Sequence, residues 1–244
     1  MRKNTLVVLV ILSLYACATN KNEDKVSLEG DWVLIQDTTK IFSGSDVGLR
    51  FAGDTISSLG NPVFLPQSPY RLKQDTIFFK DINGAELSYY ILNHTPDSLI
   101  LSRNGHTENY YNRQLEYNPD LELDSTILKT GWCFGECPNF TMVVHQDGTV
   151  HFEGFEHTKV VGKKELKMEK ESLDKLDSLF KWSYIDHLDT TRNYGAIDGW
   201  STYITFHYNE RNTAKVNGTM MEMPFRLSEL IAELTNFLQA NELI

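Results

Sequence analysis

Cys133 and Cys137 are separated by three residues, and this spacing limits the chemistry that the two thiols can perform. Such a pair can form a disulfide, act as a redox dithiol, ligate a metal or stay reduced. Redox dithiols usually have two intervening residues and lie at a helix N-terminus, whereas these cysteines precede a segment with the pattern of a strand. We therefore predict a structural disulfide, which would stabilise the fold by about 2 kcal/mol, and keep the other three states as alternatives.

Two histidines near this pair, His145 and His151, raise the alternative of a zinc site. Zinc is held by four nitrogen or sulfur ligands in a tetrahedron, and the two cysteines and two histidines would supply four. A two-residue turn at Asp147-Gly148 places the histidines on opposite faces of a hairpin, whereas a longer loop with a bulge at Gly148 places them on one face. Because oxidised cysteines would remove half of the ligands, we expect exposed histidines and no metal or other cofactor.

An acidic segment with one histidine, Asp186 to Asp198, is the second place where residue types suit chemistry. Carboxylate oxygens suit calcium, but the spacing of the common calcium loop is missing, so we expect a solvated loop. Four aromatic residues of the same region can stack on a sugar ring or a partner, or cover a long connection; they are Trp182, Tyr184, Tyr194 and Trp200. The candidates for ligand binding are Trp182, Tyr184, Asp198 and Trp200.

The composition narrows the class of function. The chain has 244 residues with 41% hydrophobic and 11% aromatic residues, which suits one large or two small folded domains. Its formal net charge of −10 argues against a nucleic-acid partner, which needs a basic patch, and against binding to anionic lipid headgroups. Neither a Gly-x-Ser-x-Gly nor a His-Glu-x-x-His motif occurs, and no glycine-rich nucleotide loop is found.

Residues 1–17 have the pattern of an export signal. A cationic start is followed by the apolar run Leu6 to Leu14, which is too short to span a bilayer and suits a signal peptide. Leu14-Tyr15-Ala16-Cys17 resembles the lipobox of bacterial lipoproteins, which implies acylation of Cys17 and anchoring in a membrane. The polar residues 18–27 are expected to form a tether. Because no Asp follows Cys17, we expect the outer membrane of the cell envelope, on either face.

Residues 28–114 have a β pattern with frequent turn signals. An Asp followed by Thr or Ser and an apolar residue recurs at Asp54, Asp75 and Asp97, which predicts one strand pair per interval in an antiparallel meander. Gly30-Asp31-Trp32 resembles the Gly-x-Trp opening of lipocalin-like domains, which implies a small β-barrel. Such a barrel would hold a small apolar ligand or, as we favour at this length, be filled by its own side chains.

Residues 115–123 are expected to link this domain to a second one, 124–244. Alternating segments around Asp147-Gly148 predict a hairpin, and apolar stripes predict helices over Glu171–Trp182 and after Pro224. The fold class is therefore α+β: a lipocalin-like barrel, then an antiparallel sheet with two packed helices.

The second domain resembles a domain of unknown function of exported bacterial proteins. The resemblance rests on Cys133-Phe134-Gly135-Glu136-Cys137-Pro138, on Asp147-Gly148-Thr149-Val150, on Asp198-x-x-Ser201-Thr202 and on Pro224. Trp200 departs from the pattern, which more often has proline there. The resemblance implies a fold and no chemistry.

These features predict a membrane-anchored envelope lipoprotein that binds or interacts without catalysis. Its partners would be the membrane, through the lipid, and an envelope protein or a small apolar ligand. The alternative is an envelope hydrolase or redox enzyme that uses Cys133 and Cys137 or the segment from Asp186 to Asp198.

Overall fold

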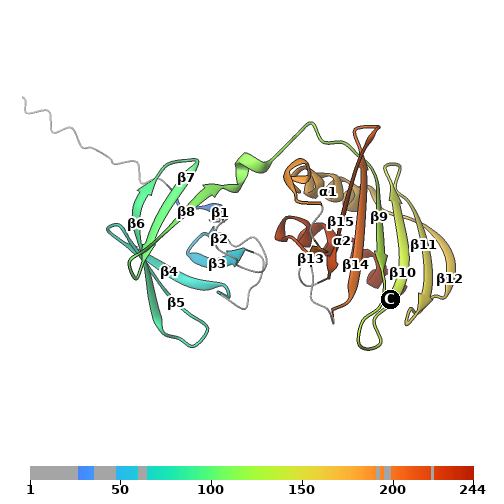
Figure 1. Ribbon diagram of the computed structural model, residues 1–244, viewed down its shortest axis with the longest axis horizontal. Helices are drawn as coiled ribbons and strands as arrows, with labels where there is room; N and C mark the ends of the chain where they lie inside the picture. Colours follow the sequence, from blue (N-terminus) through green and yellow to red (C-terminus); the bar gives the residue numbers. More distant parts are fainter. Residues whose placement is uncertain (1–26, 36–47, 60–64, 191–192, 195–198, 221–222) are drawn as a thin grey trace, which may run out of the picture.

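The protein consists of a β-barrel, a second β-sheet and two helices that lie between them (Figure 1). The computed structural model describes residues 27–35, 48–59, 65–190, 193–194, 199–220 and 223–244. Cys17 and Asp198 lie outside these residues. The closed eight-stranded antiparallel barrel, the second sheet and the two helices confirm the predicted α+β class.

The barrel is an antiparallel meander that closes on itself. Each strand pairs with the next, and β1 pairs with β8, with Trp32 opposite Asn112. The strands are β1 (Gly30–Leu34), β2 (Gly48–Ala52), β3 (Thr55–Leu59), β4 (Ser68–Lys73), β5 (Thr76–Lys80), β6 (Glu86–His94), β7 (Ser98–Arg103) and β8 (His106–Asn112). Closure pairs the two edges that an open sheet would expose.

The predicted rhythm of strand pairs is confirmed. Thr55, Thr76 and Ser98, which follow the three repeated aspartates, begin β3, β5 and β7. The turn between β7 and β8 has positive φ at Asn104 (51°) and Gly105 (78°), the conformation that favours an Asn-Gly pair in a tight hairpin.

Large side chains fill the interior of the barrel. Trp32 and Phe51 are each 1% exposed, and the Trp32 indole donates a hydrogen bond to the Leu28 carbonyl. Their buried neighbours from the other strands are Ile56, Ile77, Phe79, Tyr89, Leu99, Leu101 and Tyr110. The contact cluster is therefore continuous across the barrel, as in small barrels whose interior holds side chains.

The second sheet has seven strands in the order β12-β11-β10-β9-β14-β15-β13. They are β9 (Leu123–Thr130), β10 (Asn139–His145), β11 (Thr149–Glu156), β12 (Gly162–Lys167), β13 (Asn193–Tyr194), β14 (Ser201–Tyr208) and β15 (Asn212–Thr219). All pairs are antiparallel except the short β13–β15 pair, which is parallel. Edge strand β12 carries Lys163, Lys164 and Lys167.

Two amphipathic helices cover one face of this sheet. Helix α1 (Lys170–Lys181) buries Leu176 and Phe180, and α2 (Phe225–Ala240) begins directly after Pro224. The buried side chains of α2 are at most 7% exposed and recur at intervals of three and four; they are Phe225, Arg226, Leu227, Leu230, Ile231, Leu234 and Leu238. The sheet contributes Leu128, Met142 and Phe206, all fully buried, to the same core.

The connection between the domains is held at a few buried residues, while Leu115 and Tyr117 are exposed. The 3-10 helix η1 (Arg113–Glu116) follows the barrel, and Leu121 is 2% exposed in the core of the second domain. A second 3-10 helix, η2 (Ile185–His187), follows α1. Across the described ranges, no helix is both long and apolar enough to cross a bilayer.

Candidate functional site

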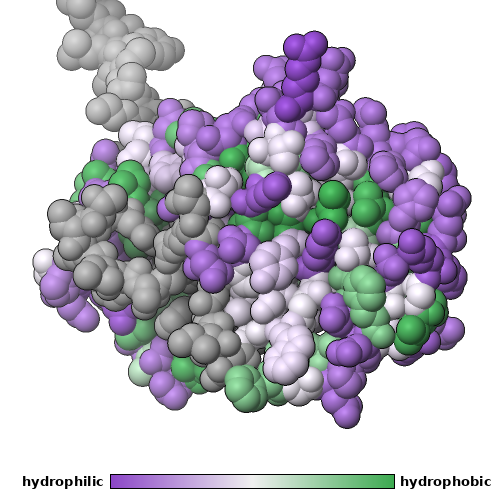
Figure 2. All heavy atoms as spheres, turned by 45° about the vertical axis from the view of Figure 1, so that its right-hand side comes forward, coloured by the Kyte–Doolittle hydropathy of each residue, from purple (hydrophilic) through white to green (hydrophobic). Residues whose placement is uncertain are grey.

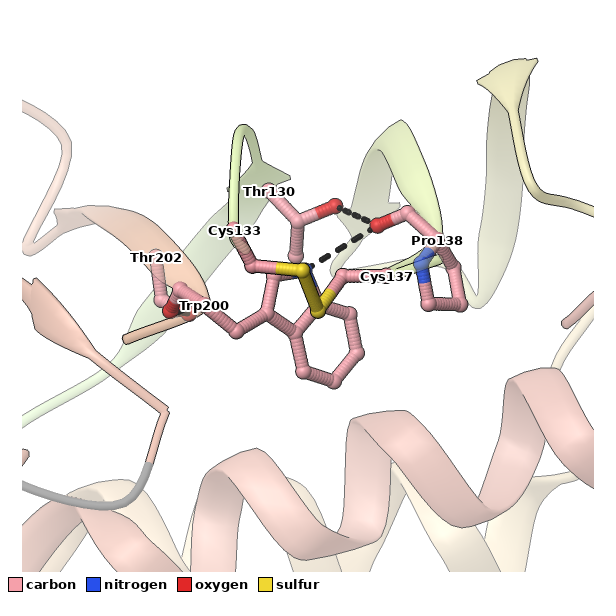
Figure 3. Close-up of a disulfide and its surroundings, with 6 residues drawn as sticks. All are labelled: Thr130, Cys133, Cys137, Pro138, Trp200 and Thr202. Carbon is pink, nitrogen blue, oxygen red and sulfur yellow. Dashed lines mark hydrogen bonds between the residues drawn. A yellow bond between two sulfur atoms is a disulfide. The ribbon is translucent and has the colours of Figure 1, made fainter. Parts of the chain in front are cut away.

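The loop between β9 and β10 is closed by Cys133 and Cys137. Their Sγ atoms lie 2.02 Å apart and their Cα atoms 6.0 Å apart, which is disulfide geometry (Figure 3). Gly135, between them, has a φ of 153°, which side-chain-bearing residues rarely adopt. The five-residue loop is therefore closed covalently and turns at a position that requires glycine.

The base of this loop is held by hydrogen bonds to the Pro138 carbonyl. The Thr130 hydroxyl donates to that oxygen at 2.7 Å, and the Trp200 indole donates to it at 3.1 Å (Figure 3). The same Thr130 oxygen accepts the Phe140 N–H at 3.1 Å. The two motif segments that the sequence separates by about sixty residues thus meet, and Trp200 makes a side-chain hydrogen bond that proline cannot make.

Backbone hydrogen bonds fix the position of Trp132 at the start of the loop. The Gly131 N–H donates to the Ser201 carbonyl at 2.9 Å, and the Ser201 N–H donates to the Trp132 carbonyl at 3.2 Å. The Thr202 hydroxyl donates to the Trp200 carbonyl, which holds the neighbouring strand. The main chain of Trp132 is therefore tied to β14 on one side and to the disulfide on the other.

Apolar side chains are exposed at this end of the sheet. Trp132 is 83% exposed and Phe134 is 88% exposed, although both are large aromatic residues. Phe155 and Tyr203, near the ends of β11 and β14, and Val161, directly before β12, are 45%, 51% and 73% exposed. We call these five residues the disulfide end. Figure 2 shows weakly polar and hydrophobic spheres over the middle and lower part of the face that the sheet presents, below a hydrophilic upper rim.

A recess of about 160 Å³ lies beside the disulfide loop. Its wall is formed by the loop and by the facing ends of β10 and β11, through Gly131, Trp132, Cys133, Gly135, Cys137, Asn139, Glu156 and His157. Asn139 and Glu156 are directly opposite each other in the strand pairing. An exposed indole, an amide, a carboxylate and an imidazole therefore surround one small depression.

His145 and His151 lie on one face of the sheet, so the longer of the two expected loops is present. Val144 is opposite Val150 and Val143 is opposite His151, while Gly148 has a φ of 84°. The two imidazole rings are 5.4 Å apart. Strand β10 separates them from the cysteines by its whole length, about 20 Å. Among the described residues, no group of three His, Cys, Asp or Glu side chains is placed to hold a metal ion.

Trp182, Tyr184 and Trp200, three of the aromatic residues near the acidic segment, do not form one surface. Trp182 packs on Tyr117 with ring centroids 4.8 Å apart. Tyr184 stacks on His187 at 4.4 Å, and the Arg226 guanidinium lies 5.3 Å from its ring. Trp182 and Tyr184 thus belong to the contact between the domains, whereas Trp200 belongs to the disulfide loop.

Asp186 is used in the fold of the second domain, and no ligand geometry surrounds it. Its carboxylate accepts the Tyr208 hydroxyl at 3.0 Å. Burial, followed by this hydrogen bond, raises the pKa of Tyr208 above its ordinary value. Asp198, the other end of the acidic segment, is outside the described residues.

A Ser-x-x-Lys spacing occurs on α1, at Ser172 and Lys175, but its environment does not suit a nucleophile and base. The Lys175 ammonium pairs with Glu233 at 2.6 Å, and this contact raises the pKa of Lys175. A lysine that acts as a base needs a lowered pKa. The pair therefore joins α1 to α2.

An ionic cluster that was not predicted from the sequence lies at the contact between the domains. Arg226, in the first turn of α2, donates from Nε to both oxygens of Glu116 at 2.9 Å and from Nη2 to the Tyr111 hydroxyl at 2.8 Å. The side chains of Arg226 and Glu116 are 6% and 0% exposed. The Tyr111 hydroxyl also donates to Glu116. Arg226 lies four residues before Leu230 and eight before Leu234, which places it on the buried stripe of α2. A charged residue at such a position needs a buried partner, and this was the sequence feature that could have indicated the cluster.

Asp31 anchors the second half of this cluster. Arg50 binds it with two hydrogen bonds of 2.6 and 2.8 Å, and Arg113 binds it at 3.2 Å. Burial alone would raise the pKa of Asp31, but the hydrogen bonds and charge of Arg50 and Arg113 outweigh burial and hold the pKa below its ordinary value. Arg50 also reaches Glu229 on α2 at 3.4 Å. The cluster therefore joins the barrel to the helices of the second domain.

Comparison with known proteins gives one family match and one structural match. Residues 124–238, which contain the disulfide loop and both helices down to Leu238, match the family described as Domain of unknown function (DUF6438). The chain is also similar to a lipocalin-like protein from Bacteroides thetaiotaomicron, seen in a crystal structure. That match has 22% sequence identity and a TM-score of 0.26, and covers 35% of this chain and 96% of the other. No curated protein matches the chain.

Proposed function

We propose that this chain is a membrane-anchored lipoprotein of the cell envelope that binds a partner without catalysis, and that the disulfide end is its contact surface. The observation that carries the proposal is the exposure of Phe134 within a covalently closed loop and of Trp132 directly before it. Aromatic side chains dominate binding energy at protein surfaces. A loop that is already rigid loses little conformational entropy when it binds.

The neighbouring residues support this contact surface. Phe155, Val161 and Tyr203 add apolar area around the loop, and charged groups border it on the sheet. An apolar centre with a polar rim is the usual anatomy of a binding surface. Single exposed apolar residues are common, but a group of five at one end of a domain marks an interaction site.

The anchor rests on the sequence. The lipobox-like segment that ends at Cys17, followed by the polar residues 18–27, supports a diacylated chain whose domains stand outside the bilayer. Two acyl chains hold a protein stably on a membrane, whereas one does not. The outer membrane is the proposed location, because no Asp follows Cys17.

Photocrosslinking from position 134 in intact cells tests the contact surface. A benzophenone amino acid that replaces Phe134 should give a discrete crosslinked product, because this side chain projects from the loop. The matched control carries the same probe at Tyr90, which is 50% exposed on the outside of the barrel. The product from position 134 should be absent from position 90 and should disappear when Trp132→Ala is added. Equal products at both positions, or none at 134, would refute the proposal.

A further inference from the structure

We infer that the recess beside the disulfide loop binds a ring of a neutral glycan, a hexopyranose unit, with the Trp132 indole as its stacking platform. This inference rests on the proposed function, because it names the ligand class for the disulfide end. Four properties of the recess carry it: the aromatic wall, the polar groups, the size and the charge.

Trp132 supplies the aromatic wall, and its main chain is held in place before a ligand arrives. Trp132 is 83% exposed, yet its carbonyl accepts a hydrogen bond from Ser201 and the next residue is held by the disulfide. A pyranose ring presents one face of C–H bonds, which carry partial positive charge. The face of an indole carries partial negative charge, so the two faces attract each other and exclude water.

The polar groups of the recess match the hydroxyls around such a ring. Asn139 offers an amide that donates and accepts, Glu156 offers a carboxylate that accepts, and His157 offers an imidazole. Asn139 and Glu156 are fixed opposite each other in the β10–β11 pair. Sugar hydroxyls both donate and accept, so they can pair with all three groups. A purely apolar ligand would leave these groups without partners, at a cost in binding free energy.

The size of the recess suits one ring. Its volume of about 160 Å³ is below the roughly 300 Å³ at which pockets for drug-sized molecules begin. The recess is also open at the surface, next to Phe134, so the rest of a glycan chain can continue outward. The site would therefore hold a single residue of a longer glycan.

The charge near the recess selects against acidic sugars. Glu156 lines the recess, and Glu136 lies on the adjoining loop. The whole chain has a formal net charge of −10. A uronic acid would bring a third carboxylate to this site, and like charges at short range repel. The expected ligand is therefore neutral.

Titration of the full chain with defined oligosaccharides tests the inference. The protein is purified in a detergent without a sugar headgroup and titrated with maltohexaose, mannohexaose, chitohexaose and hexagalacturonate. Tryptophan fluorescence and calorimetry give the affinity. At least one neutral sugar should bind roughly tenfold more tightly than hexagalacturonate, and Trp132→Ala should weaken that binding about tenfold or more. Trp132→Phe should keep part of the affinity because it keeps an aromatic face.

Phe134→Ala is the matched control, because Phe134 does not line the recess and its loss should leave glycan affinity unchanged. The inference would be overturned if no neutral sugar binds, if hexagalacturonate binds equally well, or if Trp132→Ala binds with the affinity of the parent protein. If no sugar binds but the crosslink from position 134 persists, the glycan site is refuted and the proposed function still stands. Glycan binding that requires Trp132, without any crosslink from position 134, would support the glycan site and refute the wider contact surface.

Discussion

Arg226 is a charged residue on the apolar stripe of α2, and its partner Glu116 comes from the connection between the domains. Both side chains are almost fully buried and make several hydrogen bonds to each other and to Tyr111. Burying two charges costs several kcal/mol per ion, which the pair offsets only while its hydrogen bonds are complete. The consequence is a contact that tolerates removal of neither partner alone.

Glu116→Ala or Arg226→Ala should lower the free energy of unfolding by about 3–5 kcal/mol, because each leaves the other charge buried and unpaired. Urea denaturation followed by circular dichroism measures this change. The double variant Glu116→Leu with Arg226→Met is the control and should be closer to the parent protein than either single variant, because neither charge remains. Single variants within about 1 kcal/mol of the parent would contradict the interpretation.

Asp31 should give the stability of the protein a dependence on acid pH. Its pKa in the folded state lies below the ordinary value of 3.8, so the folded protein binds this proton less readily than the unfolded chain. The stabilisation is therefore complete above the unfolded pKa and is lost as the pH falls through the folded pKa. The difference in unfolding free energy between the parent and Asp31→Asn should be constant from neutral pH to about pH 5 and shrink below about pH 4. A difference that does not vary with pH would contradict this assignment.

Secondary-structure elements could be predicted from local patterns, whereas contacts between them could not. The Asp-Thr and Asp-Ser repeats located β3, β5 and β7, and the apolar stripe located α2, because turn chemistry and periodicity act over a few residues. The Arg226–Glu116 pair joins residues 110 positions apart, and no local pattern encodes such a distance. For the same reason the aromatic residues around α1 were expected as one group, but the fold places Trp200 at the disulfide loop and Trp182 at the domain contact.

The disulfide loop depends both on its own short sequence and on residues distant from it in the chain. The spacing of its two cysteines can be read from a few adjacent residues. Its base, however, is held by hydrogen bonds from Thr130 and from Trp200, which is distant in the sequence. The exposure of Trp132 and Phe134 has no sequence signature, because aromatic residues in such a loop more often pack inward.

Cys133→Ser with Cys137→Ser should lower the free energy of unfolding by about 2 kcal/mol, because the unfolded chain regains the freedom of the closed loop. Urea denaturation measures the change, and the parent protein treated with a reductant should match the double variant. Thiol titration of the unfolded, unreduced Cys17→Ser chain should find no free thiol among these two cysteines. Two free thiols would contradict the disulfide.

The whole molecule has two domains joined by the covalent connection, an ionic cluster and an apolar contact of Val33 and Leu59 with Phe225. Because α2 contacts both the barrel and the sheet, its first turn belongs to both domains. The disulfide end lies on the second domain, so this contact sets its position relative to the barrel.

Cys17→Ser should move the protein from the membrane fraction to the soluble fraction, because the acyl chains would be the main attachment. Cell fractionation with immunodetection measures this, and Cys133→Ser with Cys137→Ser, which keeps Cys17, is the matched control that should stay with the membrane. A Cys17→Ser protein that remains in the membrane pellet after a carbonate wash would contradict the lipid anchor.

The charge of edge strand β12 affects how copies of this chain meet when they are close together. Anchored chains share a surface and meet one another far more often than the same chains in free solution, which favours strand-to-strand polymerisation at any open sheet edge. Strand β12 carries Lys163, Lys164 and Lys167 against the single acid Glu165, which gives the strand a net positive charge. Two such edges would repel each other before their main chains could pair, so under the proposed anchoring many copies would share one patch of membrane as separate molecules.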